Sequence, residues 1–163
     1  AKVYALATGT ARGYVTKAVA SEHSRTVASN LYTTPGERTV NGRQWRTTCA
    51  PYSQTSRCRT EIWATQVAYE NLQFVSRTGW VFNNLTYLPS PRALWSSNSL
   101  GYPDDWFSEG RHWKTECDDA TTGRNACRSY IWTDFISSSK GTNGVWAHRR
   151  DAGWVFNNQV LFS

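Results

Sequence analysis

Apolar and polar side chains alternate along several stretches of the chain. The clearest is Thr60–Tyr69 (TEIWATQVAY), which is rich in β-branched and aromatic residues and alternates with a period of two. Phe74–Val81, Val3–Ala7 and Gly13–Val19 have the same character. No stretch carries a sustained helical stripe, so the pattern predicts an all-β protein with little helix. Gly13–Glu22 is the most ambiguous segment, because it also has the character of a short helix.

The chain also contains a sequence repeat. The hexapeptide GWVFNN occurs at Gly79–Asn84 and again at Gly153–Asn158. Each copy follows the same two motifs, G-R-x-W-x-T-x-C and then C-R-x-x-I-W. Two copies are too few for a solenoid, which needs at least about three repeats to form a continuous core. The repeat therefore predicts two related lobes, each a small barrel-like or open sheet, packed into one compact unit.

The repeat also predicts how the chain is divided. We expect N-terminal strands that join the first lobe, a first copy, a linker rich in Pro, Gly and Asp, and a second copy, at residues 1–41, 42–88, 89–109 and 110–163. The paired asparagines that end each GWVFNN predict a turn, because Asn tolerates a left-handed backbone and bonds its own main chain.

Tryptophan is abundant, with nine residues in the chain. Six of them recur in both copies, and we expect these to fill equivalent core positions, because large aromatic rings dominate core burial: Trp45 and Trp113, Trp63 and Trp132, Trp80 and Trp154. Three have no counterpart in the other copy and are candidates for a ligand-stacking surface: Trp95, Trp106 and Trp146.

The four cysteines form two pairs that match between the copies. We predict disulfides Cys49–Cys58 and Cys117–Cys127, because a duplication should duplicate a local bridge. A zinc site is the competing interpretation, but neither pair has the short C-x₂₋₄-C spacing of such sites. Disulfides and a chain that begins at Ala1 rather than Met predict a secreted protein whose signal peptide has been removed. No apolar run is long enough to span a membrane, and we expect a monomer.

The positive charge is concentrated in the first part of the chain. The net charge is +6, but residues 1–92 carry eleven basic and four acidic residues (+7), whereas residues 93–163 carry seven basic and eight acidic residues (−1). Most basic residues are arginines, whose planar guanidinium suits carboxylate, sulfate or phosphate. We predict that the following arginines gather on one side to bind an anionic small molecule or cofactor: Arg38, Arg43, Arg46, Arg57, Arg59 and Arg77. A solvated surface is the alternative.

The chain carries no recognisable catalytic motif, so the sequence leaves open whether it is an enzyme. The histidines are not at metal-ligand spacing, and no metal site is predicted. His112 and His148 each lie among arginines, which disfavours the charged imidazolium. Either is a candidate haem ligand, with arginines meeting the propionates.

Two resemblances rest on these motifs. RTGWVFNNLTYL (Arg77–Leu88) resembles the closing hairpin of bacterial SH3-type modules, which implies binding to cell-wall peptides. In size, basic charge, disulfides and exported character, and in its W-x₃-C and GWVFNN elements, the whole chain resembles the RoxP family, small secreted antioxidant proteins of actinobacteria of the skin. That resemblance implies radical scavenging and a positively charged surface for a cofactor, and it assigns no individual residue.

Two functional hypotheses follow. The first is a secreted antioxidant that quenches radicals through its tryptophans and tyrosines or through a redox cofactor in a basic groove. The absence of Met, the side chain most readily oxidised to a sulfoxide, agrees with this hypothesis. The second is a non-catalytic module that binds cell-wall or polyanionic host glycans. Nucleic-acid binding is disfavoured, because an exported protein of modest charge has little use for it.

Overall fold

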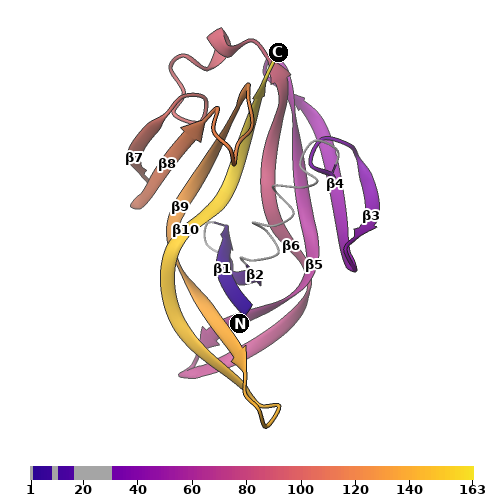
Figure 1. The fold of residues 1–163 in the computed structure, drawn as a ribbon, viewed down its shortest axis with the longest axis vertical. Coiled ribbons are helices and arrows are strands. Elements are labelled where there is room, and N and C mark those ends of the chain that lie inside the picture. Colours follow the sequence, from indigo (N-terminus) through magenta and orange to yellow (C-terminus); the bar gives the residue numbers. More distant parts are fainter. Residues whose placement is uncertain (1, 9–10, 17–30) are drawn as a thin grey trace.

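The computed structural model describes residues 2–8, 11–16 and 31–163, and most of them lie in strands (Figure 1). The elements are β1 (Lys2–Thr8), β2 (Ala11–Thr16), β3 (Gly36–Val40), β4 (Arg43–Tyr52), β5 (Thr55–Glu70), β6 (Gln73–Ser90), the short 3-10 helix η1 (Arg92–Trp95), β7 (Asp104–Ser108), β8 (Arg111–Cys117), β9 (Ala126–Lys140) and β10 (Trp146–Phe162). The predicted all-β fold is confirmed. The ambiguous segment Gly13–Glu22 begins within β2, and its residues 17–22 lie outside the described part.

The described strands form one ten-stranded sheet. Its main order is β2-β1-β9-β10-β6-β5-β4-β3, and β8 and β7 continue the sheet from β9. The long strand β9 has two partners along the same edge, because β8 pairs with its first half and β1 with its second half. Strands β6 and β10 run parallel, at Leu85–Ser90 beside Asn158–Phe162, whereas the other pairs among the described strands are antiparallel.

The two sequence-matched segments have the same strand pairing. We call β3–β6 the first unit and β7–β10 the second unit; each is a four-stranded antiparallel meander. Corresponding residues face each other in the same register: Trp45 with Ile62 and Trp113 with Ile131, and Trp63 with Trp80 and Trp132 with Trp154. The parallel junction between β6 and β10 joins the units edge to edge. The segment expected to be a linker, 89–109, contains η1 and β7.

The paired asparagines lie within long strands, so the predicted turn at this position is wrong. The pairing skips Asn83 between β5 and β6 and skips Asn157 between β9 and β10, which makes a β-bulge at the same place in each unit. The second asparagine donates its side-chain amide to the first, from Asn84 to Asn83 at 2.9 Å and from Asn158 to Asn157 at 2.7 Å. The repeated Asn-Asn thus supplies one side-chain hydrogen bond at the bulge of each unit.

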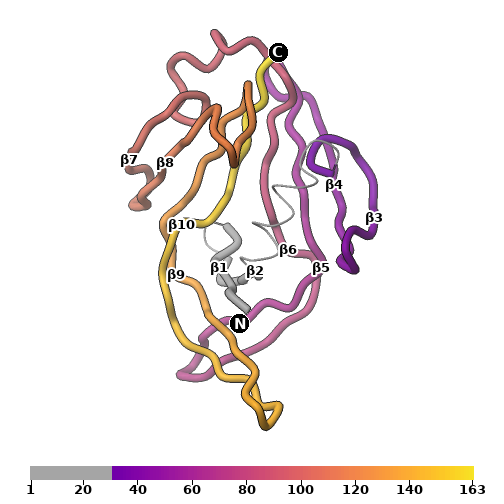
Figure 2. The backbone as a smooth tube through the Cα atoms, viewed as in Figure 1, coloured from indigo at the N-terminus to yellow at the C-terminus, as the bar shows by residue number. Residues whose placement is uncertain are grey.

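Beyond the stretches that pair with β4 and β8, the strand pairs β5–β6 and β9–β10 continue as two hairpins that meet at one end of the molecule (Figures 1 and 2). There the tip of the β5–β6 hairpin contacts β10. The Phe74 ring lies 5.2 Å from the ring of His148, and the Arg150 guanidinium lies 5.1 Å from the centre of the Tyr69 ring. The sheet is therefore closed at this end by aromatic contacts between the first and second units.

The main core lies between the inner face of the first unit and the second unit. It consists of Leu31, Tyr32, Trp45, Ile62, Ala64, Val81 and Phe156. The Tyr32 ring lies 6.3 Å from both Trp45 and Phe156, so it connects aromatic rings of the two units. Thr47 fixes the chain before β3 by donating its hydroxyl to the Leu31 carbonyl at 2.7 Å. Thr115 makes the equivalent bond to the Ser99 carbonyl in the second unit, also at 2.7 Å.

Polar groups are also buried at this core. Arg128 is only 3% exposed, and its Nε donates to Gln159 Oε1 at 2.9 Å. Burial lowers the pKa of Arg128, and it raises the pKa of Tyr130. Burial raises the pKa of Tyr32 still further, well above the normal tyrosine range. The Tyr32 hydroxyl has no hydrogen-bond partner among the described residues.

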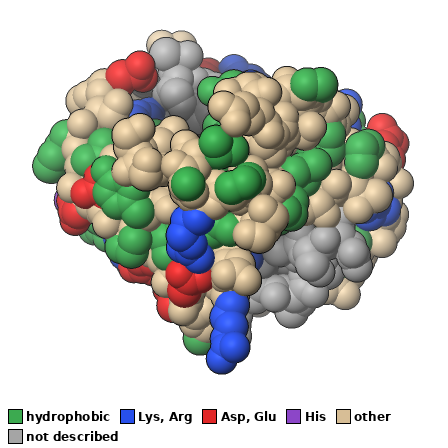
Figure 3. Space-filling view, turned by 90° about the horizontal axis from the view of Figure 1, so that it is seen from above, with side chains coloured by type: hydrophobic (Ala, Val, Ile, Leu, Met, Phe, Trp, Pro, Cys, Tyr) green, Lys and Arg blue, Asp and Glu red, His purple; other side chains and the backbone are tan. Residues whose placement is uncertain are grey.

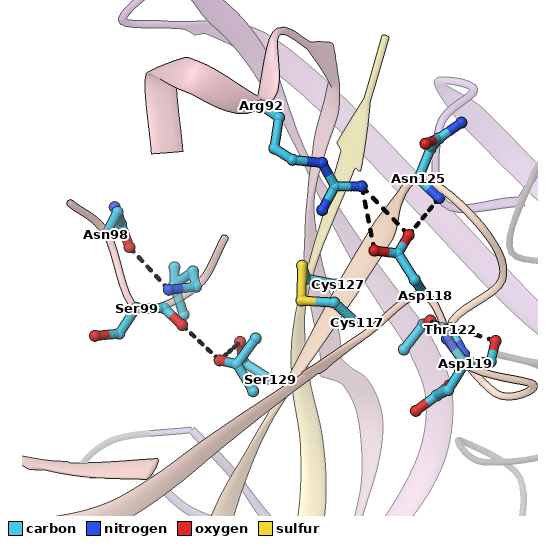
Figure 4. The surroundings of a disulfide bond; sticks show 12 residues. Arg92, Asn98, Ser99, Cys117, Asp118, Asp119, Thr122, Asn125, Cys127 and Ser129 are labelled. Carbon is cyan, nitrogen blue, oxygen red and sulfur yellow. Dashed lines mark hydrogen bonds and ion pairs between the residues drawn. A yellow bond between two sulfur atoms is a disulfide. The ribbon is translucent and has the colours of Figure 1, made fainter. Parts of the chain in front are cut away.

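The predicted disulfides Cys49–Cys58 and Cys117–Cys127 are confirmed, and the zinc alternative is thereby excluded for these cysteines. Each bridge joins directly opposed residues of neighbouring antiparallel strands. Beside the second bridge, Asp118 accepts hydrogen bonds from Arg92 and from the backbone of Asn125 (Figure 4). The bond from Arg92 is the main reason that the pKa of Asp118 is lowered. This carboxylate is therefore part of the structural support around the bridge.

We expect Tyr32→Phe to raise the free energy of unfolding by about 1 kcal/mol near neutral pH, because it removes a buried hydroxyl without a partner. In the native protein Tyr32 stays protonated, whereas in the unfolded chain it ionises above about pH 10. Ionisation therefore favours the unfolded state, and the free energy of unfolding of the native sequence falls as the pH rises above about 10. The variant should therefore lose less stability in alkali. Urea unfolding at neutral and alkaline pH measures both effects. The exposed Tyr52→Phe is the control, and a clear destabilisation by Tyr32→Phe at neutral pH would contradict the prediction.

Candidate functional site

In each unit, a second set of motif residues points to the strand face opposite Trp45 and Ile62, or opposite Trp113 and Ile131. In the second unit this face includes Phe156 of the main core. We call Arg46, Arg59, Glu61, Trp63, Trp80 and Phe82 the first ladder. The equivalent residues of the second unit are the second ladder: Lys114, Arg128, Tyr130, Trp132, Trp154 and Phe156. Within each ladder, basic side chains lie over the aromatic rings of the GWVFNN motif. The repeated motif residues therefore make equivalent contacts in the two units.

In the first ladder, the Arg46 guanidinium lies 4.5 Å from the Trp80 ring centre, and that of Arg59 lies 4.6 Å from the Phe82 ring centre. Both are cation–π distances. Glu61 lies between the two arginines: its Oε1 accepts from Arg46 Nε at 2.9 Å, and its Oε2 lies 4.0 Å from Arg59. One carboxylate thus partly neutralises two guanidinium groups.

The second ladder repeats this geometry with different charges. Lys114 Nζ lies 4.8 Å from the Trp154 ring centre, and the Arg128 guanidinium lies 5.1 Å from that of Phe156. Tyr130 takes the place of the carboxylate, and Arg128 and Phe156 are buried by the core. The two ladders therefore differ in burial, because the arginines of the first ladder are more exposed than Arg128.

Each ladder ends in two perpendicular indole rings, one of them exposed. Trp63 and Trp80 lie 5.5 Å apart at 80°, and Trp132 and Trp154 lie 5.5 Å apart at 78°. Trp63 is 43% exposed and Trp132 47% exposed, whereas their partners are half-buried. The expectation that all six repeated tryptophans fill the core is therefore wrong for the exposed pair.

The outward direction of Trp63 could have been predicted from the sequence. Ile62 directly precedes Trp63, and neighbouring residues of a strand point to opposite faces. Because Ile62 lies in the core, Trp63 must point outward. Of the six repeated tryptophans, Trp45 is completely buried, while Trp113 is half-buried.

The predicted arginine cluster is only partly formed. Arg46, Arg57 and Arg59 lie on the same face of β4 and β5. Arg43 is three residues from Arg46 and therefore points to the other face, where its Nε is buried. Arg77 lies far along the hairpin, where it binds Glu70 through two hydrogen bonds of 2.8 and 2.9 Å. The prediction that Arg43 and Arg77 gather with the other three arginines is therefore wrong.

The three unmatched tryptophans have different surroundings. Trp95 is 7% exposed, donates its indole N–H to Ser90 Oγ at 3.0 Å and packs against Gly101, so its expected surface role is wrong. A side chain at Gly101 would collide with the Trp95 ring. Trp106 is half-buried and stacks on Trp113, with ring centres 5.7 Å apart. Trp146 is 41% exposed.

The two candidate haem ligands are held by protein groups. His112 Nε2 is hydrogen-bonded to Asp105, and its ring lies between Phe107, at 4.4 Å, and Trp154, at 4.8 Å. His148 Nδ1 is hydrogen-bonded to the hydroxyl of Ser138. In the described part of the chain, no group of three or more His, Cys, Asp or Glu side chains is placed to hold a metal ion.

A cleft of about 520 Å³ adjoins the exposed indole of the second ladder. Its lining includes Trp132, Phe107, His112, Arg111 and Arg150. These side chains are the ones that a planar, anionic cofactor would meet, with the arginines toward its acidic groups and the rings along its face. This cleft was not predicted from the sequence, because residues of β7, β9 and the β5–β6 hairpin form it together.

Comparison with known proteins gives no further guidance: no family model, curated protein or solved structure matches this chain. The described residues include no helix of the length and apolar character that crossing a membrane requires. Two disulfides are typical of proteins from oxidising compartments.

We expect Glu61→Gln to strengthen binding to a polyanion more than Glu70→Gln does. Both changes remove one negative charge, but only the first releases Arg46 and Arg59 on the outer face of the first unit. Elution from a heparin column should therefore need more salt for Glu61→Gln. Equal retention of the two variants would show that net charge alone governs binding and that the first ladder is not the anion-facing surface.

Proposed function

We propose that this protein is a secreted antioxidant that quenches free radicals through its surface tryptophans. The observation that carries the proposal is the pair of perpendicular indoles in each ladder, with one ring open to solvent and 5.5 Å from a half-buried partner. An exposed indole without a ligand carries an unfavourable contact with water. Its presence at the same place in both units supports a role at the surface.

The proposed oxidants are organic peroxyl radicals. A peroxyl radical takes the hydrogen atom of the indole N–H of Trp63 or Trp132, so that the N–H bond breaks and an O–H bond forms. The products are a hydroperoxide and a neutral tryptophanyl radical. A second peroxyl radical combines with the indole ring of this radical through a new C–O bond. Each exposed indole therefore removes two radicals, and the protein is consumed in proportion.

The charges of the ladders support oxidation of the outer ring. Arg46 lies over Trp80 and Lys114 over Trp154, in both cases over the half-buried indole. A positive charge at this distance disfavours the loss of an electron from the ring below it. The unpaired electron is therefore more favourable on Trp63 and Trp132, where its reaction with a second radical takes place in solvent.

The composition of the rest of the chain supports the same function. The chain has no Met, and its four cysteines are held in disulfides. The side chains that oxidise most readily are thus absent or protected. Trp45 and Tyr32 in the main core are fully buried, so damage to the surface indoles leaves the core intact. The disulfides support export, because such bonds persist in oxidising compartments.

A redox cofactor is the alternative means of quenching. The cleft beside Trp132, with His112, Arg111 and Arg150, is the place we propose for an anionic planar cofactor such as haem. Absorption of protein isolated from its native source tests this alternative, because a bound haem gives a strong band in the near ultraviolet. Quenching by cofactor-free protein would favour the tryptophans.

We expect the double change Trp63→Phe and Trp132→Phe to remove most of the capacity to quench peroxyl radicals, because the proposal assigns quenching to the exposed rings of the two indole pairs. The measurement is the number of radicals consumed per protein molecule from a thermal azo initiator. Trp146→Phe is the matched control, since Trp146 is similarly exposed but belongs to neither ladder. A loss from the control as large as that from Trp63→Phe would contradict a special role for the indole pairs.

A further inference from the structure

The inner faces of the two units differ in what covers them. In the first unit, Trp45 is fully buried against Tyr32 from the segment before β3. In the second unit, the equivalent Trp113 is half-buried and stacks on Trp106 with an angle of 16° between the rings. The preceding segment contributes Ser99 and Leu100 here, but no aromatic ring at the place of Tyr32. The equivalent surface is therefore left open.

The open surface forms a groove between the units, with a volume of about 800 Å³. This volume lies within the range of about 300–1,000 Å³ that is typical of small-molecule sites. Its lining includes Arg57 and Tyr87 from the first unit, Trp106 and Trp113 from the second, and the amides of Asn98 and Asn158. It lies toward the end of the molecule that carries η1, where apolar side chains reach the surface among polar ones (Figure 3).

The polar lining groups have free hydrogen-bonding capacity with a defined direction. Asn98 Oδ1 accepts from the backbone N–H of Leu100 at 3.0 Å, which orients its amide and leaves the NH₂ as a donor (Figure 4). Asn158 donates to Asn157, which leaves its own oxygen as an acceptor. The serines at 97 and 108 and the carboxylate of Glu109 add further groups suited to hydroxyls.

Arg57 adds a positive charge to one side of the groove. Its guanidinium lies 4.3 Å from the Tyr52 ring centre, and Tyr52 in turn packs against Tyr87. No carboxylate of the described residues forms an ion pair with Arg57, in contrast to Arg46, Arg59 and Arg77. Stacking on Tyr52 holds the guanidinium in place, and it can bind a carboxylate through two parallel hydrogen bonds.

We propose that this groove binds a saccharide that carries a carboxylate, such as a uronic acid unit. A pyranose ring has apolar C–H faces and a rim of hydroxyl groups, which match the indole pair and the ring of amides and hydroxyls around it. Arg57 then binds the carboxylate. None of these residues belongs to a ladder, so the proposal is independent of radical quenching.

The test is calorimetric titration of the whole protein with two probes: a tetrasaccharide of alternating glucuronate and N-acetylglucosamine, and the same tetrasaccharide with its carboxylates reduced to alcohols. We expect the acidic form to bind about tenfold more tightly, because a hydrogen bond to a charged group contributes about 1.5–3 kcal/mol. Arg57→Gln should remove this difference in affinity. Trp106→Ala should weaken the binding of both probes by about tenfold or more, as loss of a stacking ring does.

Two variants serve as controls. Arg77→Gln removes a guanidinium at the far end of the hairpin, and Trp63→Ala removes an exposed indole from the first ladder, so neither should change either affinity. Circular dichroism checks that every variant is folded. The shifts of the Trp106 and Trp113 indole N–H signals on titration should report the same site. Absence of binding to both probes, or equal losses in the controls, would overturn the proposal.

Discussion

Each unit depends on the packing of two indole rings across its long hairpin. The pairs Trp63–Trp80 and Trp132–Trp154 have nearly the same distance and angle, and a basic residue lies over the inner ring of each. The same two strands place Ile62 and Val81, or Ile131 and Val155, on the opposite face, toward the interior. One short motif therefore specifies both a core layer and an outer cation–aromatic layer, because neighbouring residues of a strand alternate between faces.

The bulge after each indole pair allows the strand to continue into a different environment. Beyond Asn83 and Asn157 the strands β6 and β10 meet each other in parallel, and the two units become one sheet. The segment before β3 then covers the inner face of the first unit, whereas the segment before β7 leaves part of the second open. The repeated architecture thus has two consequences. The exposed indoles occur in both units, whereas the groove occurs only at their junction.

Much of the fold was predictable from the sequence, because it depends on local pattern. Alternation identified parts of β1, β2, β5 and β6, and the matched cysteine spacing identified both disulfides. The outward direction of Trp63 and the opposite faces of Arg43 and Arg46 were also encoded by strand parity, although composition alone suggested otherwise. The parallel junction, the burial of Trp95 beneath the loop that contains Gly101, and the groove depend on how distant segments meet, and no periodicity along the chain encodes such contacts.

The central claim is that the outer indole of each pair is the first site of oxidation. Mass-spectrometric mapping of peptides after a small, graded dose of peroxyl radicals tests it most directly. We expect Trp63 and Trp132 to be oxidised first, Trp80 and Trp154 only at higher doses, and the buried Trp45 and Trp95 last. Oxidation that begins at Trp80 and Trp154, or that is spread evenly over all nine tryptophans, would contradict a function based on the exposed rings.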